Sequence, residues 1–184
     1  MHSKSLRIKE QELGCEHVDV ARGKYNMANV LTEQGKLQEA LGMYLSALAI
    51  FETVFGQAHN DVTTAQRVIA DVYSKQENHR AELEMRLKVL RTYEKLFGPD
   101  HKRVGDALYN IAMLHEELKQ HTQAAECLKR CVCIYAKVHG DAHAETVDAR
   151  EELDRAKRHM AGIHSESDED EYGVFCSRTG KRLL

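Results

Sequence analysis

Histidine offers this chain its most versatile chemistry, and four of the eleven histidines stand at one fixed interval. Imidazole is both a common metal ligand and an acid–base catalyst. Helices pack about 8–10 Å apart, so equivalent residues of stacked helix pairs lie too far apart for one zinc ion with bonds of about 2.1 Å. We therefore predict that each imidazole instead hydrogen-bonds local backbone in a turn between repeats. The four are His17, His59, His101 and His143.

The cysteines are the second group with reactive potential. The chain has five, without the spacing of a disulfide framework, and this pattern favours reduced thiols. Cys127 and Cys131 share a helical face, but 42 and 84 residues earlier their places are taken by methionine and by valine or alanine. We therefore predict that both are small core residues. We therefore predict neither a metal site nor a redox role for the cysteines.

Catalytic constellations are absent from the sequence. There is no nucleophile–base–acid set, no glycine-rich phosphate loop and no HExxH motif. We predict that the protein is not an enzyme and needs no cofactor.

The composition fits an intracellular helical protein. Of the 184 residues 42% are apolar and 30% charged, with one proline and no tryptophan. The net charge of −3 gives no attraction to nucleic acid or anionic membrane. No apolar run approaches the roughly 18 residues of a membrane span, and no signal-peptide core is present. We expect a cytoplasmic protein, without nucleic-acid binding or membrane insertion.

The same 42-residue interval organises the rest of the chain. Glycine recurs at Gly14, Gly56, Gly98 and Gly140. Small and large apolar residues between these glycines recur at the same interval. Apolar residues at helical spacing on both sides of Gly35 predict two antiparallel helices in each unit. Gly56 is expected to end its helix in the left-handed conformation.

The interval also predicts the domain organisation. Residues 1–15 are predicted to form the second helix of a partial N-terminal repeat, which is either an unusual cap or part of an array truncated there. Full repeats follow at 16–58, 59–100 and 101–142. A capping helix at 143–164 has an apolar stripe of Leu153, Ala156, Met160 and Ile163.

The C-terminal segment, 165–184, changes in character. Its acidic run and few apolar residues predict disorder. Ser165 and Ser167 precede acidic residues and are candidate phosphorylation sites.

Several motifs are similar to those of one repeat family. Asn26-Met27-Ala28 and Asn110-Ile111-Ala112, with the turn Phe97-Gly98-Pro99-Asp100-His101, resemble tetratricopeptide repeats of the 42-residue kinesin light chain type. The usual tetratricopeptide period is about 34 residues. The resemblance covers about residues 1 to 150 and implies an all-α, right-handed α-solenoid of antiparallel helix pairs.

The resemblance also implies a function and a site. In such arrays the first helix of each pair lines a concave groove that holds a peptide of a partner protein. Asparagine suits this groove because its amide both donates to and accepts from a peptide backbone, and tyrosine adds apolar area. We call the residues placed there by register the first-helix row. They are Arg22, Tyr25, Asn26, Asn29, Glu33, Thr64, Arg67, Asp71, Lys75, Asp106, Tyr109, Asn110 and Met113.

Two further interpretations stay open. The row is a solvated surface if Asn26 and Asn110 only bond neighbouring helices. The protein is a structural scaffold if it self-associates through the N-terminal half-repeat. A kinesin complex also stays open as a partner, although that family joins its motor through a coiled coil and these 184 residues contain no sustained heptad region.

Overall fold

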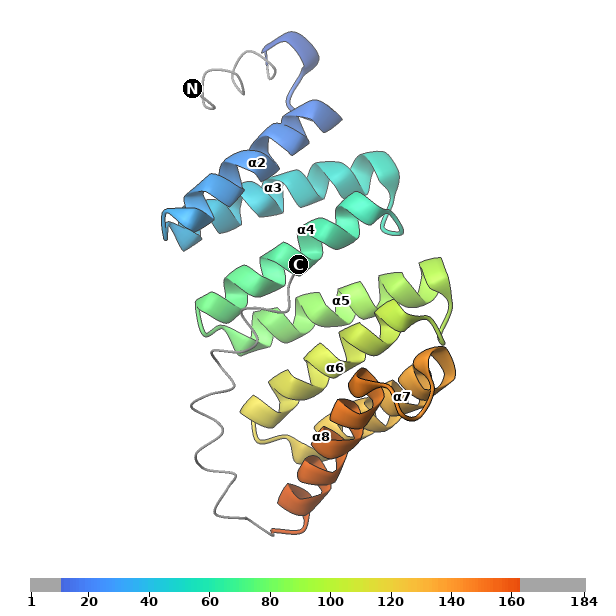
Figure 1. Cartoon of the computed structure of the whole chain (residues 1–184). Coiled ribbons are helices and arrows are strands. Elements are labelled where there is room, and N and C mark those ends of the chain that lie inside the picture. The colour runs from blue at the N-terminus through green and yellow to red at the C-terminus, as the bar shows by residue number, and fades with distance from the viewer. Residues whose placement is uncertain (1–10, 163–184) are drawn as a thin grey trace.

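The computed structural model describes residues 11–162, and from residue 18 onward these form a stack of α-helices (Figure 1). Each helix packs on the next one in the chain, from α2 to α8. Three first helices of 16 residues alternate with three second helices of 19 residues, and one last helix has 17. The predicted all-α solenoid is therefore correct. The helices are α2 (Val18–Glu33), α3 (Leu37–Phe55), α4 (Asn60–Lys75), α5 (His79–Phe97), α6 (Lys102–Glu117), α7 (His121–His139) and α8 (Ala144–Met160).

The pairs α2/α3, α4/α5 and α6/α7 fall within the three predicted repeats, and α8 falls within the predicted cap. The division into repeats itself stays a prediction. Of the predicted N-terminal half-repeat only residues 11–15 are described, and the predicted disordered tail with Ser165 and Ser167 lies outside the described residues.

The periodic histidines cap the helices that follow them. Nδ1 of His17, His59 and His101 accepts the backbone N–H two residues on, at 3.1 Å in each case. His143 does the same at 3.3 Å. Each bond satisfies one of the donors that a helix start leaves unpaired. The predicted bonding of imidazole to local backbone is confirmed.

The turns before His59, His101 and His143 also stack rings. The His59 ring lies 4.1 Å from the ring of Phe55, and the His101 ring 4.7 Å from that of Phe97. Gly56, between Phe55 and His59, has φ 75° as expected, but its ψ of 169° differs from the predicted left-handed helical conformation. This extended region with positive φ is open essentially to glycine alone. It turns the chain out of one helix and directly towards the next cap.

The small residues that recur in each repeat lie in the core. Ala28, Ala70 and Ala112 are fully buried, as matching packing requires. The predicted apolar stripe of the cap is partly wrong, and its last member, Ile163, lies outside the described residues. Ala156 is buried, but Met160 is 51% exposed, while its neighbour His159 is only 8% exposed. The helix is rotated so that an imidazole replaces the expected methionine at the interface.

Candidate functional site

The first-helix row lies at the surface of α2, α4 and α6, and none of its members is fully buried. The exposed members are Arg22, Asn26, Glu33, Arg67, Lys75 and Asn110. The half-buried members are Tyr25, Asn29, Thr64, Asp71, Asp106, Tyr109 and Met113.

Several half-buried members tie the first helix of a pair to the second. In α2, Asn29 Oδ1 accepts a hydrogen bond of 2.6 Å from the hydroxyl of Tyr44 in α3. The ring of Tyr25 meets the same tyrosine edge to face at 5.3 Å. Burial raises the pKa of both phenols, so the Tyr44 hydroxyl stays a donor. The side chain of Asn29 is therefore engaged by the second helix of its own helix pair.

At the equivalent positions 42 residues later, a different interaction joins the two helices of the pair. Asp71 and Arg86 take the positions of Asn29 and Tyr44, and their carboxylate and guanidinium lie 3.5 Å apart. Burial raises the pKa of Asp71, although the neighbouring cation of Arg86 acts in the opposite direction. An ion pair between α4 and α5 thus takes the place of the neutral hydrogen bond between α2 and α3.

Arg86 also reaches a carboxylate that sequence reasoning missed. Glu82 is 3% exposed and stands where the neighbouring repeats have Ala40 and Ala124. Its Oε1 lies 2.7 Å from the guanidinium of Arg86. The interval itself carries the signal, because a charged residue at a position of small core residues predicts a buried charge.

In the third pair this place is apolar. Met113 packs against the cluster that contains Leu128, the equivalent of Arg86. Nearby, Asp106 accepts a 2.8 Å hydrogen bond from the Tyr135 hydroxyl and lies 3.2 Å from the ammonium of Lys102. Asp106, like Asn29 and Asp71, is therefore engaged within the protein.

Asn26 and Asn110 differ from these members. Both are exposed, and across residues 11–162 neither side chain makes a hydrogen bond or ion pair with another residue. The interpretation that they only bond neighbouring helices is therefore not supported. Each presents a donor and an acceptor to solvent from the middle of a first helix.

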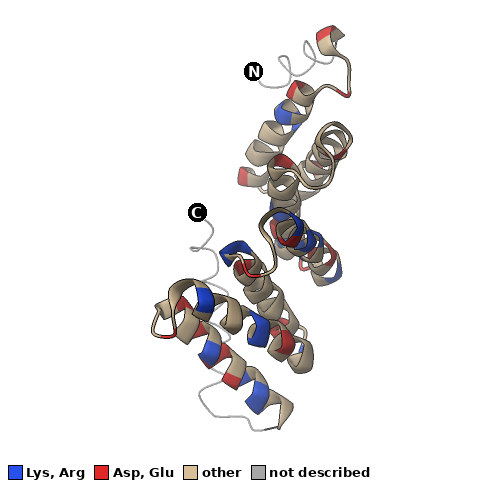
Figure 2. Cartoon of the chain, turned by 90° about the vertical axis from the view of Figure 1, so that its right-hand side faces the viewer, with Lys and Arg blue, Asp and Glu red and all other residues tan. Residues whose placement is uncertain are grey.

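The first two helix pairs meet at the row through an ion pair. Arg22 of α2 lies 3.5 Å from Asp61 at the start of α4. Lys and Arg are interspersed with Asp and Glu along the stack in Figure 2. A row with both signs of charge favours a ligand that also carries both, or one with an apolar centre.

The thiols in the described residues are free. Cys131 is fully buried, and its thiol donates to the carbonyl oxygen of Gly105 at 3.3 Å. Burial raises its pKa to about 12, so the thiol stays protonated. The prediction that Cys131 is a core residue is confirmed, and Cys127 is half-buried beside it.

Within residues 11–162, no helix has both the length and the apolar character that crossing a bilayer requires.

Comparison with known families identifies the repeat. A family model described as the tetratricopeptide repeat matches residues 1–53, 19–95 and 61–137, which together span most of the chain. No match was found among curated proteins.

Solved structures share the fold. A kinesin light chain-type protein of Podosopora anserina with nearly identical TPR-like repeats superposes with a TM-score of 0.75 at 20% identity, over 100% of this chain and 86% of that one. A point variant of that protein gives 0.74 at 20% identity, with the same coverage of both chains. BtubC (BKLC) from P. vanneervenii gives 0.71 at 16% identity, over 100% of this chain and 73% of that one.

Proposed function

The chain belongs to the tetratricopeptide repeat family, and from that membership we propose that it is a non-enzymatic adaptor that binds peptide segments of partner proteins along the first-helix row. Repeats of this family mediate protein–protein interaction, and the structural neighbours include kinesin light chain-type repeats. The proposal includes a cytoplasmic location, which agrees with the free thiols.

One observation carries the proposal: Asn26 and Asn110 are exposed amides without a partner among the described residues, while their neighbours are engaged. A peptide backbone has one donor and one acceptor per residue, and an asparagine amide matches both. Such contacts hold a chain in place without selecting its side chains. Selection then falls to the charged members, Arg22, Arg67 and Lys75 among them.

We expect the Asn26→Ala/Asn110→Ala variant to lose affinity for a captured peptide. Two neutral hydrogen bonds contribute about 2 kcal/mol in total, so the Kd rises about 30-fold. Because both residues are exposed and unbonded, and alanine is the better helix former, the free energy of unfolding should not fall. Affinity capture from lysate with mass spectrometry identifies ligands, and calorimetry with the captured peptide measures the Kd.

Gln57→Ala/Gln123→Ala is the matched control, since it removes two exposed amides outside the row. Its affinity should equal that of the wild type. The proposal fails if both variants capture the same proteins with unchanged affinity, and a large drop in the melting temperature of the asparagine variant shows a structural role instead.

A scaffold that self-associates near its N-terminus is the second candidate, and it rests on the exposure of Leu13, which is 45% accessible. Light scattering of the calorimetry samples separates the two functions. A mass that rises with concentration favours the scaffold, and a constant monomer mass excludes it.

A further inference from the structure

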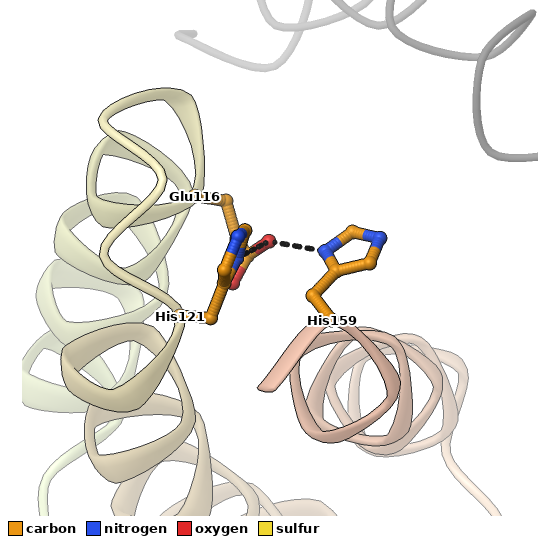
Figure 3. Close-up of side chains that lie close together, drawn as sticks. All are labelled: Glu116, His121 and His159. Carbon is orange, nitrogen blue, oxygen red and sulfur yellow. Dashed lines mark hydrogen bonds and ion pairs between the residues drawn. The ribbon is translucent and has the colours of Figure 1, made fainter. Parts of the chain in front are cut away.

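Three side chains meet where α8 closes the stack. Glu116 lies at the end of α6, His121 begins α7, and His159 lies at the end of α8. Oε2 of Glu116 is 3.0 Å from Nδ1 of His121 and 2.9 Å from Nδ1 of His159. Figure 3 shows both imidazoles directed at this one carboxylate oxygen. The three helices thus converge on a single polar centre.

The centre is buried. Glu116 and His159 are each 8% exposed, and the His121 side chain is 23% exposed. Oε1 of Glu116 is buried and has no hydrogen-bond partner among the described residues. A buried carboxylate oxygen without a partner is costly, so this structure contains an unused acceptor next to two imidazoles.

We propose that Glu116, His121 and His159 form a binding site for one divalent transition-metal ion of the kind that imidazole prefers, with Zn²⁺ as the ion to test. Two imidazole nitrogens and one carboxylate are a ligand set that zinc uses in sites where water takes the fourth position.

The geometry admits the ion after a small adjustment. The ligand atoms of the three residues all lie within 4.8 Å of one another. Zinc bonds of about 2.1 Å place neighbouring tetrahedral ligands about 3.4 Å apart, so the two nitrogens must each move a few tenths of an ångström from the carboxylate oxygen. Nδ1 coordinates the ion through its lone pair, so in the metal-bound site each imidazole carries its proton on Nε2.

The equivalent junction one repeat earlier shows what is specific to the three residues of the proposed site. His79 and Glu117 stand 42 residues before His121 and His159, and they lie 4.0 Å apart at the corresponding place between α5 and α6. That junction has one imidazole and neighbouring carboxylates. At the last junction the second imidazole of His159 replaces a carboxylate, which changes an ion-pair site into a metal-ligand set.

A second group of potential ligands, His139, His143 and Glu145, is less suited to a metal. The ammonium of Lys102 lies 2.9 Å from Glu145 and competes with any cation. Nδ1 of His143 already accepts the N–H of Glu145. His139 therefore supplies a matched control, since its loss removes one histidine from the same part of the stack.

Metal binding at the proposed site joins α6 and α7 to the closing helix α8, so it should raise the melting temperature. The test is a Co²⁺ titration of the full chain after treatment with a chelator, followed by competition with Zn²⁺. We expect one equivalent of Co²⁺ with visible d–d absorption and without the near-ultraviolet charge transfer of a thiolate ligand. Zn²⁺ should displace it and raise the melting temperature reversibly.

The variants His159→Ala and Glu116→Gln should each raise the Co²⁺ Kd at least about tenfold, because loss of a ligand costs no less than loss of an outer-shell contact. His121→Asn keeps a polar helix start and should abolish the Zn²⁺-dependent rise in melting temperature. His139→Ala should bind as the wild type does. Less than half an equivalent of Co²⁺, a thiolate charge-transfer band, or equal losses in His139→Ala and His159→Ala would overturn the proposal.

Discussion

Replacing Arg86 with leucine is expected to lower the free energy of unfolding by about 3–5 kcal/mol. The change removes the guanidinium that lies 2.7 Å from Glu82 and 3.5 Å from Asp71. Glu82 is 3% exposed, so its carboxylate cannot recover the lost interaction from water. Urea denaturation followed by circular dichroism measures the loss.

The chain supplies the matched control in its third helix pair. Ala124 and Leu128 stand where the second pair has Glu82 and Arg86, and both are fully buried. The triple variant Asp71→Met/Glu82→Ala/Arg86→Leu copies that apolar arrangement, because Met113 stands where the second pair has Asp71. Apolar replacement of a buried ion pair is often neutral or stabilising, so we expect stability at or above that of the wild type.

Comparing Arg86→Leu with this control separates the effect of an uncompensated buried carboxylate from the effect of lost arginine packing. If the triple variant is as unstable as Arg86→Leu alone, loss of arginine packing, and not the stranded carboxylates of Glu82 and Asp71, causes the effect. The account of this pair of helices would then be wrong.

The second large effect is expected for Gly105→Ala, which should cost about 1–3 kcal/mol. A methyl group at Gly105 meets the Tyr135 ring at 2.7 Å and Ile134 at 3.3 Å. The Tyr135 ring cannot retreat easily, because its hydroxyl donates to Asp106. Thermal and urea unfolding both report the change.

Gly42→Ala is the control for helix propensity. Gly42 is exposed within α3, and an added methyl group there has nothing within 4 Å. Alanine in a helix interior is favoured over glycine by about 0.5–1 kcal/mol, so this variant should be more stable than the wild type. Equal shifts in the two variants would show that α6 and α7 are not closely packed at Gly105.

The 42-residue interval made the fold accessible from the sequence. Equivalent residues have equivalent surroundings in a stacked repeat, so Ala28 and Ala112 could be placed in the core and His59 and His101 in the turns before any contact was known. The same reasoning made Cys131 a core residue.

Contacts between inequivalent positions were beyond this reasoning. Glu116, His121 and His159 meet although they are separated by 5 and 43 residues, which no multiple of the interval brings together. The period relates histidines 42 residues apart, and those cannot share an ion. The rotation of α8 that buries His159 and exposes Met160 depends on packing against α6 and α7.

The row was predicted as one surface, but its members divide into two kinds. The interval fixes which face of a helix a residue shares, and it says nothing of what the second helix offers opposite. Asn29 was grouped with Asn26, yet of the two only Asn29 accepts a hydrogen bond from Tyr44. The chemistry opposite each position differs from pair to pair.

The most direct test of the account is where a bound peptide lies. Backbone amide chemical shifts of the labelled full chain should be recorded with and without a peptide obtained by capture. Binding along the first-helix row predicts that the largest changes fall in α2, α4 and α6, around Asn26, Arg67 and Asn110. Changes concentrated in α3, α5 and α7, with the first helices unaffected, would contradict the proposed function.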